Sequence, residues 1–239
     1  MVMQALFDLL IPRTCLVCGR ILGAREKHLC IWCEEDLPLT YYWEQVHNPM
    51  ADELNALLER HRPKGETVSY LFATALLFYD HENPYKRIPQ ALKYRSNLPA
   101  GRYFAAQLGR YLASATQFKD VDLVIPVPLH WYRKWRRGYN QAEVIAKELA
   151  QALGAKLGTD ILYRVHRTRT QTRLDAESRL KNVANVFRIR HYPSAFHHIL
   201  IVDDTFTTGA TLFACYSVLR SALSPDIRIS VATLSVVQN

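Results

Sequence analysis

Residues 199–211 read Ile-Leu-Ile-Val-Asp-Asp-Thr-Phe-Thr-Thr-Gly-Ala-Thr, and this order of residue types decides the fold. The aliphatic run 199–202 predicts a buried parallel strand, because both faces of such a strand need apolar cover. Asp203 and Asp204 follow where the strand is expected to end. A hydroxyl-rich turn with one glycine then leads into an apolar segment from Ala210 that predicts a helix.

This order of strand, turn and helix predicts a ligand site. In open α/β sheets, ligands bind at the carboxyl ends of strands, and phosphate binds where the free N–H groups of a helix N-terminus converge. Carboxylates repel phosphate, so the acid pair suits a neighbouring polyol or a metal-bound group of the same ligand. A sugar phosphate with free hydroxyls meets both demands. The alternative is a strand followed by an ordinary capped turn, since Asp and Thr also cap helices.

The stretch resembles the signature with which type I phosphoribosyltransferases bind phosphoribosyl pyrophosphate (PRPP). That signature is an apolar strand, two acidic residues, a short spacer and Thr-Gly-x-Thr at the start of a helix. The resemblance implies that Asp203 and Asp204 are the catalytic pair and hold the ribose 2- and 3-hydroxyls. It also implies that the 5-phosphate is held by the backbone amides and hydroxyls of Thr207, Thr208, Gly209, Ala210 and Thr211.

The composition predicts a folded protein with a sizeable core. The chain has 239 residues, of which 49% are apolar and 22% charged, and this length fits one large domain, or one domain with a small appendage. No apolar run approaches the ~18 residues that span a bilayer. Residues 1–11 lack the basic start and cleavage site of a signal peptide and predict a short amphipathic helix. We therefore expect a cytoplasmic protein with no membrane insertion.

The net charge of +8 is unevenly distributed along the chain. Residues 1–65 hold 7 basic and 9 acidic side chains, whereas residues 66–239 hold 23 and 13. Between residues 130 and 190 the count is 14 basic against 5 acidic. A concentrated positive field attracts polyphosphates or nucleic acid, and charge alone does not choose between them.

Four of the five cysteines form two Cys-x2-Cys pairs, Cys15/Cys18 and Cys30/Cys33, separated by eleven residues. Two such pairs can place four thiolates around one zinc ion, and a closed site of this kind is structural. Disulfides are the alternative, but nothing marks the chain for export. We expect His28 to be a bystander and the fifth cysteine, Cys215, to be a small buried apolar residue.

The remaining chain alternates between expected strands and helices. We expect helices over 51–60, 88–95, 101–118 and 139–153, one or two strands within 68–79, and strands over 121–125, 160–165, 183–190, 198–202 and 227–237. This alternation predicts an α/β fold with a mainly parallel sheet flanked by helices. We divide the chain into a zinc-binding domain and connector over 1–65, and a phosphoribosyltransferase-like domain over 66–239.

This arrangement suggests functional roles for two polar loops. The loop after strand 121–125 opens at the same sheet edge as the acid pair, and residues 167–187 form a long polar segment between strands. In type I phosphoribosyltransferases, the loops at these places bind pyrophosphate and close over it as a flap. The alternative is ordinary solvated surface. The resemblance implies a pyrophosphate loop of Pro128, Leu129, Arg133, Arg136 and Arg137, and a flap with Arg169 and Arg173.

Taken together, the motifs resemble the competence protein F (ComF/GntX) family. The matching pieces are the two cysteine pairs, Ala-Leu-Lys-Tyr-Arg at 91–95, Pro-Val-Pro-Leu at 126–129, Arg-Gly-Tyr-Asn-Gln at 137–141, Gln-Thr-Arg-Leu at 171–174, Arg-x2-Asn-Val at 179–183 and the acid-pair signature. The resemblance implies binding of PRPP with Mg²⁺, and a part in the uptake of transforming DNA. If the chain is an enzyme, it implies transfer of a phosphoribosyl group. Thr207 departs from the acidic residue of many purine-salvage enzymes, and a threonine cannot act as a general base at pH 7.

Residues 130–139 support a different function. Four aromatic rings interleave with four cations there, a composition that suits base stacking together with phosphate attraction. This predicts a non-catalytic module that binds single-stranded DNA, or a partner ATPase or helicase of competence, with a PRPP-sensing or vestigial site. The candidate nucleic-acid residues are Trp131, Lys134 and Trp135. The alternative, which we favour from the sequence, is that Trp131 or Trp135 packs beneath the loop.

Overall fold

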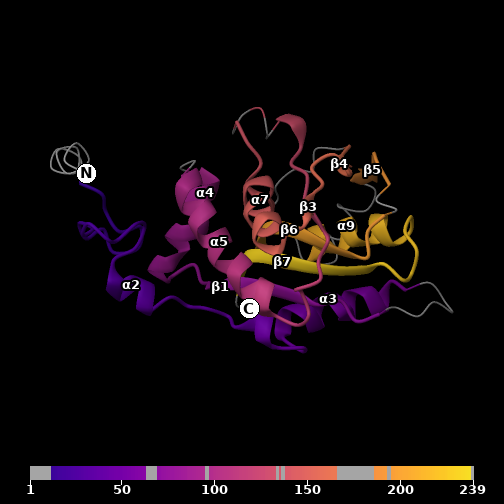
Figure 1. Cartoon of the computed structure of the whole chain (residues 1–239), viewed down its shortest axis with the longest axis horizontal. Helices are drawn as coiled ribbons and strands as arrows, with labels where there is room; N and C mark the ends of the chain where they lie inside the picture. Colours follow the sequence, from indigo (N-terminus) through magenta and orange to yellow (C-terminus); the bar gives the residue numbers. More distant parts are fainter. Residues whose placement is uncertain are drawn as a thin grey trace.

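A computed structural model describes residues 12–62, 69–94, 97–132, 135, 138–165, 186–192 and 195–237. Its centre is a five-stranded parallel sheet (Figure 1). The strand order is β1-β7-β6-β2-β3. The strands are β1 (Ala73–Tyr79), β2 (Leu123–Pro126), β3 (Lys156–Leu157), β6 (His198–Phe206) and β7 (Arg228–Val237).

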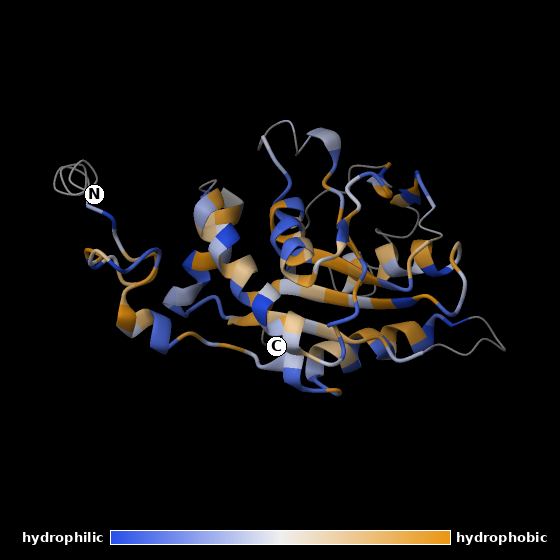
Figure 2. Ribbon diagram, in the orientation of Figure 1, coloured by the Kyte–Doolittle hydropathy of each residue, from blue (hydrophilic) through white to orange (hydrophobic). Residues whose placement is uncertain are grey.

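Helices cover both faces of this sheet. One face packs against α4 (Arg87–Tyr94), α5 (Leu98–Ser114) and α7 (Gln141–Leu153). The other face packs against α3 (Pro49–Arg60) and α9 (Ala210–Arg220). Along β6, residues 199 and 201 belong to the second core, and residues 200 and 202 belong to the first. This alternation explains why residues 199–202 are all apolar, and the parallel sheet between two layers of helices confirms the predicted α/β class. Figure 2 shows orange, hydrophobic segments in the strands of the sheet.

The segment before residue 63 covers one edge of the sheet and then joins its core. After α2 (Ile31–Glu35), the chain runs antiparallel to β1, where the Thr40 N–H donates to the Leu76 carbonyl at 3.1 Å and the Phe78 N–H donates to the Pro38 carbonyl at 2.8 Å. This pairing covers an otherwise open strand edge. The chain continues through η1 (Tyr42–Glu44) into α3, which packs under the sheet. The domain boundary near residue 65 stays a prediction.

Among the described residues, asparagine side chains cap the N-termini of three α-helices. Asn48 accepts a hydrogen bond from the Ala51 N–H at 2.9 Å, and Asn97 accepts one from Ala100 at 3.2 Å. Asn140 accepts one from the Ala142 N–H at 3.2 Å at the start of α7. These caps satisfy N–H groups that have no partner within the helix. Gly154 ends α7 in the left-handed conformation, with φ 65°.

Two parts of the sheet differ from the expectations. The strand expected over 198–202 continues to Phe206, because the ten-residue β7 pairs with it as far as Phe206↔Val236. The strands expected near 160–165 and 183–190 are β4 (Leu162–Arg164) and β5 (Phe187–Ile189), which form a separate antiparallel pair. The expected flap connects these two strands, and its residues 166–185 lie outside the described residues. A short 3-10 helix, η2 (Pro84–Lys86), precedes α4.

A hydrogen-bonded cluster fastens β6 at the amino edge of the sheet. The buried His198 ring contacts Asp120 through Nδ1 at 2.9 Å and the Ser230 hydroxyl through Nε2 at 2.6 Å. Asp122 accepts hydrogen bonds from the N–H groups of residues 197 and 198, at 2.8 and 3.0 Å. Burial lowers the pKa of His198 to about 4, against the opposing charge of Asp122, so its imidazole is neutral near pH 7.

Among the described residues, no helix combines the length and the hydrophobicity that crossing a bilayer would require.

Candidate functional site

The carboxyl ends of β2 and β6 lie side by side and form a topological switch point. β2 leads through α7 to β3 on one side, whereas β6 leads through α9 to β7 on the other. The two helices cover opposite faces of the sheet, so the chain leaves the two strands in opposite directions. Residues 126 and 202 are in register, and the Val127 N–H donates to the Val202 carbonyl at 2.8 Å. Open α/β sheets bind ligands in the crevice that such a switch point creates.

The acid pair lies at this point, within the last part of β6. Asp203 and Asp204 are half-buried, and the Asp204 N–H donates to Asp203 Oδ1 at 2.8 Å. Successive strand residues point to opposite faces, so Asp203 faces the side of α9 and Asp204 faces the side of α7. Burial raises the pKa of the Cys215 thiol on α9, and the nearby Asp203 charge raises it further. A ligand that contacts both acids therefore lies across the edge of the sheet.

The turn after β6 has the form of an anion site. Thr207 is exposed, Thr208 is half-buried, and Gly209 adopts a left-handed conformation with φ 66° immediately before α9. No side chain among the described residues caps this helix, which leaves the first N–H groups of α9 directed at the turn. The structure thus places three of the five predicted phosphate-binding residues, 207–209, in the turn that follows β6, and the other two, 210 and 211, at the start of α9.

Helix α3 supports this turn from below. A Cβ atom on Gly209 would lie 2.9 Å from Leu54 Cδ2 and 3.0 Å from the Phe206 ring. The φ angle favours glycine there, and a larger residue would also have to displace the end of the Leu54 side chain. The sequence gives no sign of this contact, because residues 54 and 209 are far apart along the chain.

The loop after β2 lies at the same edge of the sheet as the acid pair. Pro128 and Leu129 are half-buried and follow β2 directly, as predicted. His130 is buried, and its Nδ1 accepts a hydrogen bond from the Tyr132 N–H at 3.2 Å. The predicted contributions of several cations fall outside the described residues: Arg133, Lys134, Arg136, Arg137, Arg169 and Arg173.

The two tryptophans of this loop are exposed, and the expectation that one packs beneath it is wrong. Trp131 is 69% exposed and Trp135 is 77% exposed. Tyr132 lies between them, with ring centroids 6.0 Å from Trp131 and 6.3 Å from Trp135. The buried position at the base of the loop is taken by His130, which leaves both indoles in solvent.

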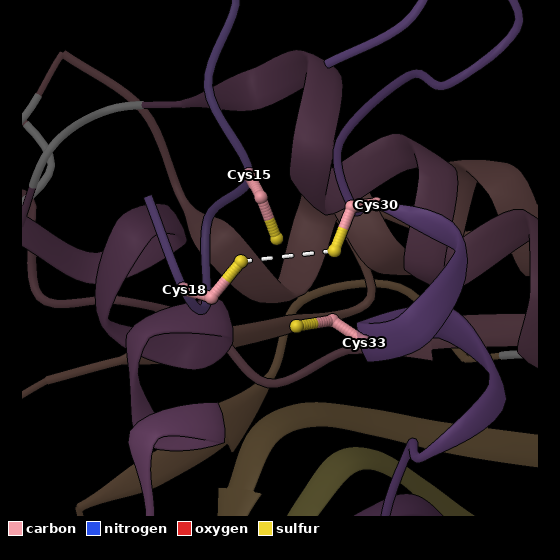
Figure 3. A group of neighbouring side chains, drawn as sticks. All are labelled: Cys15, Cys18, Cys30 and Cys33. Atoms are coloured by element: carbon pink, nitrogen blue, oxygen red, sulfur yellow. Dashed lines mark hydrogen bonds between the residues drawn. The ribbon is translucent and has the colours of Figure 1, made fainter. Parts of the chain in front are cut away.

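The four cysteines of the N-terminal pairs come together as predicted. Figure 3 shows the side chains of Cys15, Cys18, Cys30 and Cys33 pointing toward a common centre. Their sulfur atoms all lie within 4.8 Å of one another, and the Cys18 and Cys30 sulfurs are 3.7 Å apart. Zn–S bonds of ~2.3 Å in a tetrahedron separate the sulfurs by about 3.8 Å, so this donor set fits a zinc ion.

Local interactions shift the pKa of two of these thiols and stabilise the module that carries them, residues 12–36. Burial raises the pKa of Cys15, but N–H groups of residues 17, 18 and 30 outweigh it and lower the pKa to about 7. Burial and the neighbouring thiols raise the pKa of Cys33. Gly19, with φ 76°, closes the first pair by donating its N–H to the Cys15 carbonyl at 3.0 Å. His28 packs on Tyr103 and is not part of the cluster, as expected.

The module is attached to α4 and η2 by side chains that the sequence analysis did not identify. The Arg87 guanidinium of α4 donates to the Val17 carbonyl at 2.6 Å, and the Tyr85 hydroxyl donates to the Cys33 carbonyl at 3.1 Å. Both acceptors are backbone atoms of the cysteine loops. The cysteine loops are therefore fixed against α4 and η2.

The described residues define an α/β protein with an acid pair and an amide-lined turn at a switch point, and with a four-thiol module. No protein-family model matches the chain. Over 115 residues it is 36% identical to competence protein F of Haemophilus influenzae, and this alignment covers 47% of this chain and 50% of that protein. Over 91 residues it is 41% identical to DNA utilization protein YhgH of Salmonella typhi, which covers 38% of this chain and 40% of that protein.

These alignments span about half, or less, of the curated relatives. Over the matched part, the chain is a homologue of competence protein F and YhgH, in agreement with the resemblance seen in the motifs.

Solved structures align with this chain only distantly. A hypoxanthine phosphoribosyltransferase from Staphylococcus aureus aligns with a TM-score of 0.34 and 17% identity, over 57% of this chain and 63% of that one. Orotate phosphoribosyltransferase from Aeropyrum pernix aligns with a TM-score of 0.30 and 17% identity, over 76% and 93%. At these scores, no residue role is carried over to the present chain.

We predict that the purified protein carries zinc at the four-thiol cluster. Replacing one thiol of each pair, as in Cys18→Ser with Cys33→Ser, removes the closed donor set and should abolish zinc retention and lower the melting temperature. Elemental analysis by mass spectrometry and a thermal melt measure both effects. Cys215→Ser is the control, because that thiol lies outside the cluster and should leave the zinc content unchanged. Equal zinc in the double variant and in the wild type would contradict the assignment.

Proposed function

We propose that this protein binds Mg-PRPP at the carboxyl ends of β2 and β6, and that it acts in DNA uptake or utilization. The observation that carries the proposal is the arrangement of the acid pair. Asp203 directly follows the residue that pairs with β2, and the amide-lined turn begins three residues after Asp204. One ligand with hydroxyls at one end and a phosphate at the other fits this arrangement. The names of the homologues support the link with DNA.

Each part of the site has a role in this proposal. Asp203 and Asp204 hold the ribose hydroxyls, and the backbone amides of residues 207–211 hold the 5-phosphate. Residues 128–137 bind the pyrophosphate end, with Arg133, Arg136 and Arg137 supplying charge. The acid pair also suits a hard cation such as Mg²⁺, which neutralises diphosphate charge when bound.

If the protein turns PRPP over, the reaction displaces pyrophosphate from the anomeric carbon of the ribose. Negative charge then develops on the leaving group, and the flap residues Arg169 and Arg173 would stabilise it. Thr207 carries no group that titrates near neutral pH, so it provides no general base. Binding of PRPP is therefore the function that the geometry supports best.

We predict that Asp203→Asn with Asp204→Asn abolishes binding of Mg-PRPP. The amides keep the shape of the carboxylates but lose the charge that attracts hydroxyl protons and the cation. Isothermal titration calorimetry measures the affinity, and zinc content should stay at the wild-type value. Asp226→Asn makes the same chemical change in the turn before β7, at the opposite edge of the sheet, and should bind normally. Undiminished affinity in the double variant would defeat the proposal.

The exposed tryptophans favour a second function, binding of single-stranded DNA. Two indoles that are 69% and 77% exposed flank a tyrosine in a loop that also contains four cations. Exposed aromatic rings between cations provide stacking platforms and phosphate attraction together. Both functions are compatible, because the loop and the acid pair lie at the same edge of the sheet. A partner ATPase or helicase stays a prediction from the family resemblance.

We predict that Trp131→Ala with Trp135→Ala weakens binding of a labelled oligothymidine. Stacking contributes about 1–3 kcal/mol per base, so each lost ring should weaken binding roughly 5- to 150-fold. Fluorescence anisotropy at several salt concentrations measures the affinity, which should fall with rising salt. Trp32→Ala is the matched control, because Trp32 is also exposed, at 63%, but lies on the four-cysteine module. An equal loss in the control, or wild-type affinity in the double variant, would exclude the stacking role.

A further inference from the structure

Strand β7 carries three hydroxyl residues that are almost completely buried: Ser230, Thr233 and Ser235, with exposures of 1%, 0% and 1%. A central parallel strand is normally filled with apolar side chains. Burying a hydroxyl is unfavourable unless it is hydrogen-bonded, so each of these side chains needs a partner. Their partners show what the hydroxyls hold in place.

The hydroxyls serve opposite edges of the sheet. Ser230 bonds to the His198 ring at the amino edge, where β6 begins. Ser235 lies at the carboxyl edge, where its Oγ is 3.1 Å from Thr205 Oγ1 and 3.4 Å from the Asp204 carbonyl oxygen. Thr233 donates to the Ser235 carbonyl at 2.9 Å. Ser235 therefore contacts the strand segment that carries the acid pair.

The strand register arranges these residues in two cross-strand pairs. Asp203 pairs with Thr233, and Thr205 pairs with Ser235. Side chains of directly opposed residues on neighbouring strands lie next to one another. Thr205 and Ser235 are therefore neighbours beside the strand segment that carries the acid pair.

Donor counting fixes the direction of the two Ser235 bonds. Each hydroxyl has one proton to donate, and a carbonyl can only accept. Ser235 therefore donates to the Asp204 carbonyl, and Thr205 donates to Ser235. The two bonds hold the peptide between Asp204 and Thr205, and thus the backbone from which the Asp204 side chain extends.

We propose that Ser235 and Thr205 are positioning residues that fix the acid pair for its ligand. This inference rests on the proposed binding of Mg-PRPP. Neither hydroxyl is assigned a contact with the ligand, and both act through the backbone of residues 204 and 205. Loss of either hydroxyl should leave the fold intact and reduce the affinity for Mg-PRPP.

Calorimetric titration of Ser235→Ala with Mg-PRPP tests the inference, with Ser230→Ala as the control. The two variants delete the same hydroxyl, on the same strand, from positions that are equally buried. Removing a residue that orients a metal-ligating side chain typically costs roughly 10-fold or more in affinity, and we use this as the scale for a residue that orients the acid pair. We expect a loss of that size for Ser235→Ala and none for Ser230→Ala, and thermal melts should show that both variants are folded.

A second pair of variants separates the hydroxyl from packing. Thr205→Val keeps the shape of the side chain and removes the hydroxyl, so it should weaken binding of Mg-PRPP. Thr205→Ser keeps the hydroxyl and should bind Mg-PRPP as the wild type does. Wild-type affinity in Ser235→Ala and Thr205→Val would overturn the positioning role and leave the binding proposal standing. An equal loss of affinity in Ser230→Ala would show that the effect comes from general stability, and this result would also overturn the positioning role. Failure of the wild type itself to bind Mg-PRPP would overturn both proposals.

Discussion

The parallel pairing of β2 with β6 is the constraint on which the candidate site depends. The hydrogen bond from the Val127 N–H to the Val202 carbonyl ends this pairing, and the next residues on the two chains are Pro128 and Asp203. The two strands then lead to helices on opposite faces, the arrangement at which open α/β sheets bind ligands. Loops that are about 75 residues apart in sequence thereby lie at the same edge of the sheet.

The N-terminal part of the chain supports this region more closely than a connector would. Leu54 of α3 contacts the place where a Gly209 side chain would lie, and the segment before α3 pairs with the edge of β1. The four-cysteine module adjoins α4 and α5, at the left end of the molecule in Figure 1, away from β4 and β5. The turn after β6 is thus contacted by residues from both of the domains expected from the sequence, 1–65 and 66–239.

The sequence predicted the strand, acid pair, turn and helix because each has a local cause: an apolar run, two carboxylates, a glycine and an apolar helical segment. It also predicted the cysteine cluster from spacing alone. It placed the end of β6 too early, since acids and hydroxyls favour turns and only pairing with the long β7 keeps residues 203–206 extended. The exposure of Trp131 and Trp135 was missed, because an amphipathic loop does not reveal that His130 takes its buried position.

The central claim is that the acid pair, the turn and the loop after β2 bind a single ligand. Hydrogen–deuterium exchange with and without Mg-PRPP tests this claim most directly, because it reads backbone protection at each segment. The account predicts slower exchange at residues 207–211 and 127–132 together, at the same PRPP concentration. Protection at only one of the two segments, or at neither, would contradict it.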